Sequence, residues 1–119
     1  MSNSVKKDVS LLMVALYDST YLDDILLGIT SISGARVTIL DGITSTENLS
    51  QNIPMFAHLI GMTGDQGCKV LFSATTTEQP VTQLLALLDA AGVDFVGRSL
   101  GEIFCFKLCE AVLADELDI

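Results

Sequence analysis

Residues 9–41 read VSLLMVALYDSTYLDDILLGITSISGARVTILD, and this stretch decides the fold. Its start, VSLLMVALY, is an apolar run of the length that a buried strand takes. Apolar residues then recur at steps of three and four, which is typical of one face of a helix. The end, RVTILD, alternates as a strand does. The stretch therefore predicts a strand, a helix and a second strand.

The predicted helix carries residues that mark its two ends. Asp18 and Thr20 belong to the types that cap helix N-termini, because their side chains accept hydrogen bonds from free backbone N–H groups. Gly34 fits the left-handed conformation that closes many helices. Asp23 and Asp24 fall in the first turn, where we expect them to favour the helix dipole and not to act in catalysis.

A second copy of this order follows. The third predicted strand is CKVLFSATT, residues 68–76. Thr77 is the expected cap of the second helix, and Gly92 is its expected end. The fourth strand is expected to begin at residues 93–96 and to be completed, after a turn, by EIFCFKL at residues 102–108.

The order strand, helix, strand, strand, helix, strand predicts an α+β fold, the ferredoxin-like βαββαβ sandwich. Its sheet has four antiparallel strands. Both helices are expected on one face of the sheet, because crossover connections are right-handed. The chain, residues 1–119, is expected to form a single domain.

Two segments fall outside the repeat. Residues 42–67 form a connection of 26 residues with four glycines, which is far longer than most connections. We expect this long connection to be functional or mobile. Residues 109–119 form an acidic C-terminal tail that we expect to fray.

The first strand is apolar on both of its faces. Leu12, Val14 and Leu16 share one face, and Leu11, Met13 and Ala15 share the other. Helices that lie on one side of the sheet can cover only one of these faces. We therefore expect the second face to be buried between subunits.

Charge and cysteine content limit the partners and the compartment. The net charge is −9 and the six Lys and Arg are scattered, so we expect no nucleic-acid binding, although an RNA-recognition domain shares the strand order. The three cysteines leave one unpaired in any scheme, which favours a reducing compartment. Neither a secretory signal nor an apolar stretch of about 18 residues is present. We expect a cytoplasmic protein that is not an integral membrane protein.

Few side chains suggest chemistry. His58 is the one histidine and has no identifiable nucleophile as a partner, so we expect no enzymatic activity. A loop histidine is its simpler interpretation, and a metal ligand or a pH-sensitive contact between subunits is the alternative. Arg98 stands between Gly97 and Gly101, which allow a ligand to approach the backbone. A solvated charge is the simpler interpretation of Arg98, and contact with an anion is the functional one.

Three short motifs carry a resemblance to a known family. They are YLDDIL at residues 21–26, GARVTIL at residues 34–40 and GEIF at residues 101–104. Through them the chain resembles the PII and PII-like signalling proteins over most of residues 9–108. That family shows a helix start rich in leucine and aspartate, a glycine followed by a threonine-bearing strand, and a fourth strand that begins glycine-cation-isoleucine-phenylalanine. Residues 42–67 lie where the family has its T-loop.

The resemblance implies a ferredoxin-like homotrimer that is not an enzyme. It also implies a small effector, often an adenine nucleotide, in clefts between subunits, and a protein target engaged through residues 42–67. By resemblance, Thr38 lies near the base of the ligand and Gly42 close to its phosphates. Arg98 and Gly101 would belong to the loop that faces those phosphates. Replacing Arg98 by alanine is then expected to weaken ligand binding without unfolding the protein.

Two departures from the family pattern point to another ligand. Glu102 stands where nucleotide-binding members carry a lysine that contacts phosphate, and a carboxylate there repels a triphosphate. Residues 44–66 contain no tyrosine, so the uridylylation site of some members is missing. Two other families with this fold stay open. One is a CutA-like metal-binding trimer, for which His58 and the thiols are the soft ligands, and the other is an ACT-like amino-acid-sensing domain.

Overall fold

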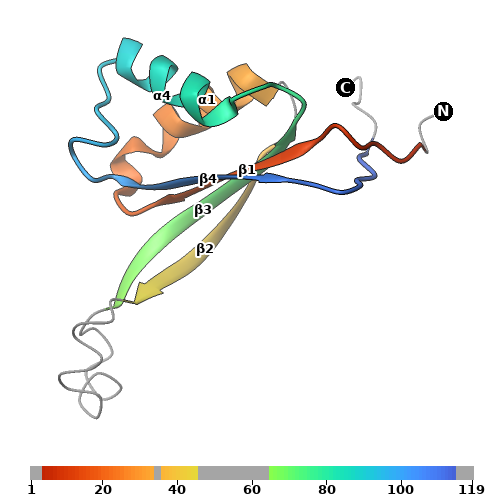
Figure 1. The fold of residues 1–119 in the computed structure, drawn as a ribbon. Helices are drawn as coiled ribbons and strands as arrows, with labels where there is room; N and C mark the ends of the chain where they lie inside the picture. The colour runs from red at the N-terminus through yellow and green to blue at the C-terminus, as the bar shows by residue number, and fades with distance from the viewer. Residues whose placement is uncertain (1–3, 34–35, 46–64, 115–119) are drawn as a thin grey trace.

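The computed structural model describes residues 4–33, 36–45 and 65–114. They form a four-stranded antiparallel sheet in the order β2-β3-β1-β4, with both helices on one face of the sheet (Figure 1). The strands are β1 (Ser10–Leu16), β2 (Thr38–Ser45), β3 (Asp65–Thr75) and β4 (Gly101–Lys107), and the helices are α1 (Leu22–Ser33) and α4 (Pro80–Ala90). The α+β, ferredoxin-like prediction is confirmed.

The strand register brings distant parts of the chain to one end of the sheet. One row crosses all four strands at Asp41, Lys69, Leu16 and Gly101. Lys69 forms an ion pair with Asp41 within this row. Gly42 is the next residue along β2, so Gly42 and Gly101 lie at the same end of the sheet although they belong to opposite edge strands.

The hydrophobic core lies between this sheet and the two helices. Its fully buried members include Leu12, Val14 and Leu16 of β1, Leu71 of β3, Ile25 and Ile29 of α1, and Leu84 and Leu88 of α4. Burying one such side chain stabilises the fold by about 1.5–3 kcal/mol. A Cβ added at Gly28 would lie 2.7 Å from Cδ1 of Leu84, so this glycine lets α1 and α4 pack closely.

The segment before β4 differs from the prediction. Residues 93–96 were expected to begin the fourth strand, but they belong to a turn, and this prediction is wrong. Val93 and Phe95 point into the core while Val96 is 71% exposed. The turn therefore shows the same alternation of buried and exposed residues that predicted a strand. The turn is closed by backbone bonds from Arg98 N to the Asp94 oxygen and from Leu100 N to the Phe95 oxygen, both 3.1 Å.

The strands β2 and β3 are longer than expected. The connection was predicted to start at residue 42 and to end at residue 67, yet β2 continues to residue 45 and β3 begins at residue 65. The two strands keep pairing there, and together they extend past the helices as a two-stranded arm, which we define as residues 43–45 and 65–67 (Figure 1). His58 and the rest of the predicted connection fall outside the described residues.

Helix ends follow the predictions in part. Asp18 accepts a hydrogen bond from Thr20 N at 3.0 Å and caps a short 3-10 turn, Ser19–Tyr21, that leads into α1. Gly92 has a φ of +83°, as expected after α4. Thr77 does not cap α4: its hydroxyl donates to the Ile32 carbonyl oxygen at 3.2 Å, and Gln79 occupies the cap position with no side-chain bond. Gly34 lies outside the described residues.

The beginning of the C-terminal tail is paired with the N-terminal segment. Ala111 N donates to the Lys6 carbonyl oxygen at 2.8 Å, and Lys6 N donates to the Ala111 oxygen at 2.7 Å. The expectation of a frayed tail is therefore wrong at residue 111. Residues 115–119 are outside the described ranges.

Candidate functional site

Of the four residues that the sequence predicts as ligand contacts, two lie at one end of the sheet, but on its opposite edge strands β2 and β4. These two are Gly42 and Gly101. Thr38 lies on the same side of β2 as Gly42 but four residues away, which is about 13 Å along a strand. Thr38 is exposed and pairs with Phe72 in the middle of the sheet. Arg98 belongs to the turn that precedes β4.

Arg98 is directed toward the start of α1. Its guanidinium carbon lies 5.7 Å from the centroid of the Tyr21 ring, within the range of a cation–π contact. The pKa of the Asp18 carboxyl is lowered, first by hydrogen bonds from Thr20 and to a smaller extent by the charge of Arg98. Arg98 therefore has protein partners in this structure and does not line the cavity beside Gly101.

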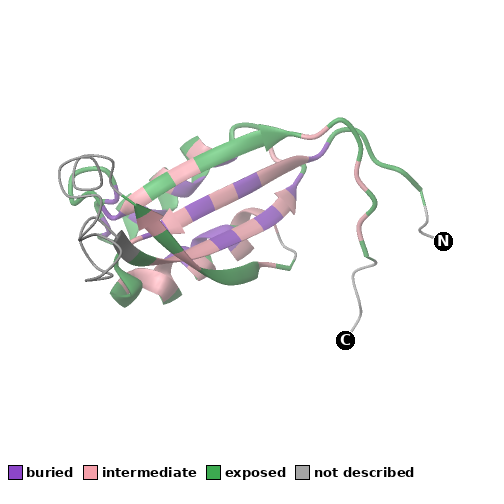
Figure 2. Cartoon of the chain, turned by 90° about the horizontal axis from the view of Figure 1, so that it is seen from below, coloured by how far each residue is buried: buried purple, intermediate pink, exposed green. Residues whose placement is uncertain are grey.

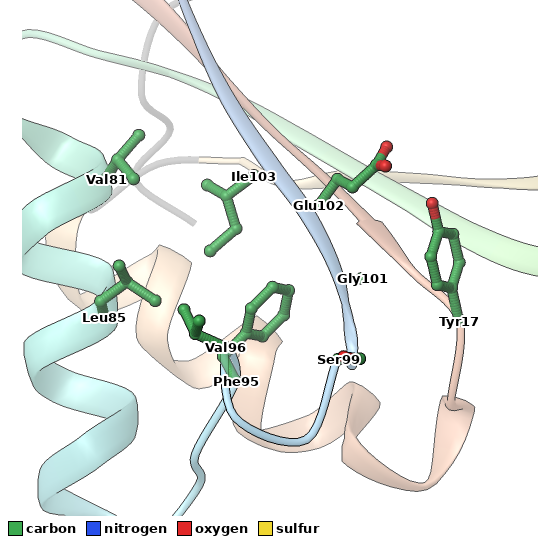
Figure 3. A pocket seen from close by; sticks show the side chains of 9 residues that line it. All are labelled: Tyr17, Val81, Leu85, Phe95, Val96, Ser99, Gly101, Glu102 and Ile103. Carbon is green, nitrogen blue, oxygen red and sulfur yellow. The ribbon is translucent and has the colours of Figure 1, made fainter.

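A cavity of about 450 Å³ lies along the edge strand β4 (Figure 3). Its apolar wall consists of Val81 and Leu85 of α4, Phe95 and Val96 of the turn, and Ile103 of β4. Its polar lining consists of Tyr17, Ser99 and Glu102, with Gly101 between the two sides. A volume of this size fits a small organic molecule.

Tyr17 and Glu102 lie on the side of β4 away from the helices, opposite to the apolar wall that α4 and Ile103 form (Figure 3). Tyr17 follows β1 directly, and its hydroxyl points toward the carboxylate of Glu102 on β4 (Figure 3). Burial raises the pKa of the Tyr17 phenol above its usual value, and the charge of Glu102 and a hydrogen bond to it raise this pKa further. These effects keep the phenol protonated, so that it can donate to the carboxylate.

Tyr17 also connects the cavity to the other edge of the sheet. Thr44 on β2 is a polar neighbour of the Tyr17 side chain and lowers its pKa, against the larger effects that raise it. The Thr44 hydroxyl donates in turn to Sγ of Cys68 at 3.5 Å. The polar cluster Tyr17, Glu102, Thr44 and Cys68 therefore spans all four strands at the base of the arm.

A second cavity of about 280 Å³ lies on the β2–β3 side of Tyr17. It is lined by Gly42, Gly67, Cys68, Lys69 and Asp41 together with Leu16, Tyr17 and Ser19. Tyr17 lines both cavities, with Gly42 in one and Gly101 in the other. Sequence reasoning did not select Tyr17, and the only available signal was its position as a polar aromatic residue at the end of an apolar strand.

The sheet face opposite the helices is not covered by either helix (Figure 2). Along β1, buried residues on the helix side alternate with half-buried residues on this open face, while the two edge strands are exposed over most of their length. Phe104 and Phe106 of β4 stack with their ring centroids 6.3 Å apart and remain 41% and 45% exposed. We call this surface the open face: Leu11, Met13, Ala15, Leu40, Val70, Phe72, Phe104 and Phe106.

Metal sites, membrane-spanning helices and known relatives give little information about the function of this chain. Within residues 4–33, 36–45 and 65–114, no three His, Cys, Asp or Glu side chains lie together as metal ligands. No helix in this part of the chain is long and apolar enough to cross a membrane. Comparison with models of protein families and with curated proteins finds no match.

Proposed function

We propose that this chain is a PII-like regulatory protein that is not an enzyme. In this proposal three copies assemble, a small effector binds in the clefts between them, and residues 42–67 carry the signal to a protein partner. Thr38, Gly42, Arg98 and Gly101 are the proposed effector contacts. The single observation that supports the proposal best is the open face, an apolar sheet surface that neither α1 nor α4 covers (Figure 2).

The open face supports self-association for a physical reason. Phe104, Phe106 and Leu40 expose between 41% and 51% of their surface on one continuous side of the sheet. Monomeric soluble proteins seldom leave a large apolar patch in water, and such patches usually mark an interface. A second and third copy of the same chain would cover the open face with surfaces of the same kind.

The position of the cavities supports an effector that controls the arm. Gly42 and Gly101 line separate cavities, and Tyr17 lines both. An effector that contacts Tyr17 would act on Thr44 of β2 at the base of the arm, which leads into the long connection. In this arrangement, binding shifts the populations of arm conformations through Thr44, a polar neighbour of Tyr17. The three free thiols fit a reducing, cytoplasmic setting for this protein.

Native mass spectrometry of freshly purified protein tests the proposal. We expect a mass three times the chain mass of 12.7 kDa, with any retained effector as an added mass. A monomeric mass at micromolar concentration would overturn the proposed assembly. A thermal-shift panel then compares adenine nucleotides and other small molecules with divalent metals. Stabilisation by metals alone would favour the CutA-like alternative instead.

A further inference from the structure

Glu102 is the one charged residue in the described rows of the sheet that cross β1 and form the open face. The other members of these rows are Leu11, Met13, Ala15, Thr38, Leu40, Val70, Phe72, Ala74, Phe104 and Phe106. The charged residues Asp41, Lys69 and Lys107 belong to rows on the helix side of the sheet. The open face is therefore nearly free of charge, although the net charge of the chain is −9.

This distribution of charge favours a second copy of the chain as the partner of the open face. Two copies that each carry a net charge of −9 repel one another, and the repulsion is weakest where the facing surfaces carry few charges. The helix layer is a poorer contact surface for a second copy, because it carries Asp23, Asp24 and Asp89. The open face presents apolar side chains with one carboxylate at their border.

Glu102 loses water if a second copy covers the open face. It pairs with Ala15 across the ladder between β1 and β4 and is exposed in the single chain. Its carboxylate points away from α4 and toward the Tyr17 hydroxyl (Figure 3). Within the described part of the chain no basic side chain forms an ion pair with it, and the Arg98 guanidinium lies over the Tyr21 ring. The Tyr17 phenol is therefore a donor that remains beside the carboxylate when water leaves.

We infer that Glu102 limits the association of copies through the open face, so that one carboxylate sets how tightly the chains assemble. The inference rests on the proposed function and deepens it, because it names the residue that regulates the proposed assembly. A carboxylate that leaves water without a cation beside it opposes association, whereas an amide of the same shape loses much less hydration free energy. The Tyr17 phenol offsets part of this cost by donating to the carboxylate.

Sedimentation velocity over a dilution series of the full chain tests the inference. The measured quantity is the midpoint, the protein concentration at which half of the chains are assembled. Glu102→Gln keeps the shape and removes the charge, so we expect the midpoint to fall about tenfold, because less hydration is lost on association. Circular dichroism checks the fold, which should persist because residue 102 is exposed on an edge strand.

Asp89→Asn is the matched control for the charge. It changes the net charge of the chain by the same amount as Glu102→Gln, at an exposed position on α4, on the other side of the sheet (Figure 1). We expect its midpoint to stay within about twofold of the wild-type value, since distant charges are largely screened by salt.

Tyr17→Phe should act in the opposite direction. It removes the phenol that faces Glu102, so we expect the midpoint to rise about threefold to tenfold, because the carboxylate loses a donor. In combination with Glu102→Gln the same substitution should have a smaller effect, because a neutral amide depends less on that donor. A purely structural role of Glu102 does not predict opposite changes in assembly at two neighbouring residues.

Two results at the midpoint would overturn the inference. One is a Glu102→Gln midpoint that equals or exceeds the wild-type value, and the other is an equal fall for Asp89→Asn. If every variant stays assembled at the lowest concentration measured, the exchange of isotope-labelled chains between assemblies gives the same comparison. We then expect slower exchange for Glu102→Gln than for the wild type, and equal or faster exchange would contradict the inference.

The inference and the proposed function fail in different ways. A wild-type trimer whose midpoint does not fall with Glu102→Gln contradicts the inference and leaves the proposed function standing. Wild-type protein that is monomeric while Glu102→Gln assembles supports the inference and contradicts the proposed assembly of the wild type. If both proteins are monomeric at every concentration, both proposals are wrong.

Discussion

Gly101 approaches the backbone of Ala15 so closely that a Cβ added at Gly101 would lie 2.0 Å from the Ala15 carbonyl oxygen. No side chain fits there unless β4 moves away from β1 at the first pair of their ladder, Leu16 with Gly101. We therefore expect Gly101→Ala to lower the free energy of unfolding by about 1–3 kcal/mol, as overpacking does. Urea denaturation measures this loss.

Gly67→Ala is the matched control for this substitution. Gly67 is also a strand glycine, but a Cβ there meets no atom within 4 Å. We expect its effect to stay within about 0.5 kcal/mol. Equal losses for the two variants would show that the contact with Ala15 does not limit residue 101.

Arg98 gives a prediction that separates structure from binding. Because its guanidinium lies 5.7 Å from the Tyr21 ring centroid at an exposed turn, Arg98→Ala should lower the free energy of unfolding by about 0.5–1 kcal/mol. A double-mutant cycle with Tyr21→Leu, measured in urea, should assign most of this loss to the pair.

As a proposed effector contact, Arg98 should also contribute to binding of an anionic group. An Arg98→Ala variant that binds ADP as the wild type does would remove Arg98 from the site.

The sequence reveals most of this fold because its elements are local. Apolar steps of three and four predicted α1 and α4, and the doubled order predicted the four-stranded sheet. The turn at residues 93–96 was mistaken for a strand because Val93 and Phe95 point inward and Val96 outward, the same alternation that a strand shows. Neither the alternation nor the residue types distinguish these two structures.

The site is less visible in the sequence because it depends on register. Tyr17 and Glu102 lie close together because Ala15 of β1 pairs with Glu102 of β4, and these two strands are far apart in the chain. A shift of one residue would send Glu102 to the helix side of the sheet. Gly101 was selected by its resemblance to a ligand loop, and the structure adds a packing reason for the same glycine, its contact with Ala15.

Tyr17 gives a prediction about pH. Because its pKa is raised in the folded protein, first by burial and then by Glu102, the folded state holds the phenol proton more tightly than the unfolded chain does. The resulting stability is fully present below 10.0, the ordinary pKa of a tyrosine phenol, and is lost as pH rises through the folded value. Tyr17→Phe should remove this alkaline loss, so the stability difference between wild type and variant should shrink above pH 10.

Thermal or urea unfolding at pH 8 and at several values above pH 10 measures this difference. At pH 8, Tyr17→Phe should cost about 1 kcal/mol through the lost hydrogen bond to Glu102. Tyr21→Phe, which keeps the ring beneath Arg98, is the control and should change little at pH 8. A gap between wild type and Tyr17→Phe that stays constant with pH would contradict the role assigned to the Tyr17 proton.

The open face gives the prediction that bears on assembly. Phe104 pairs with Met13 and stacks on Phe106, so its ring belongs to the apolar surface, on the side of the edge strand β4. If copies of the chain cover this surface, Phe104→Glu places a charge in a dry interface, where no partner compensates its desolvation. We expect this variant to dissociate to monomers that stay folded, since residue 104 is 41% exposed within one chain.

Leu27→Glu is the control for the assembly prediction. Leu27 is 66% exposed on α1, on the opposite side of the sheet, and the same substitution there should leave the assembly intact. Light scattering at micromolar concentration reports the mass of each variant, and circular dichroism reports that each is folded. Phe104→Glu protein that keeps the wild-type mass would exclude the open face as the interface. If both variants lose mass, the contact between subunits is not confined to the open face. An interface that the open face forms predicts that Phe104→Glu alone dissociates the assembly.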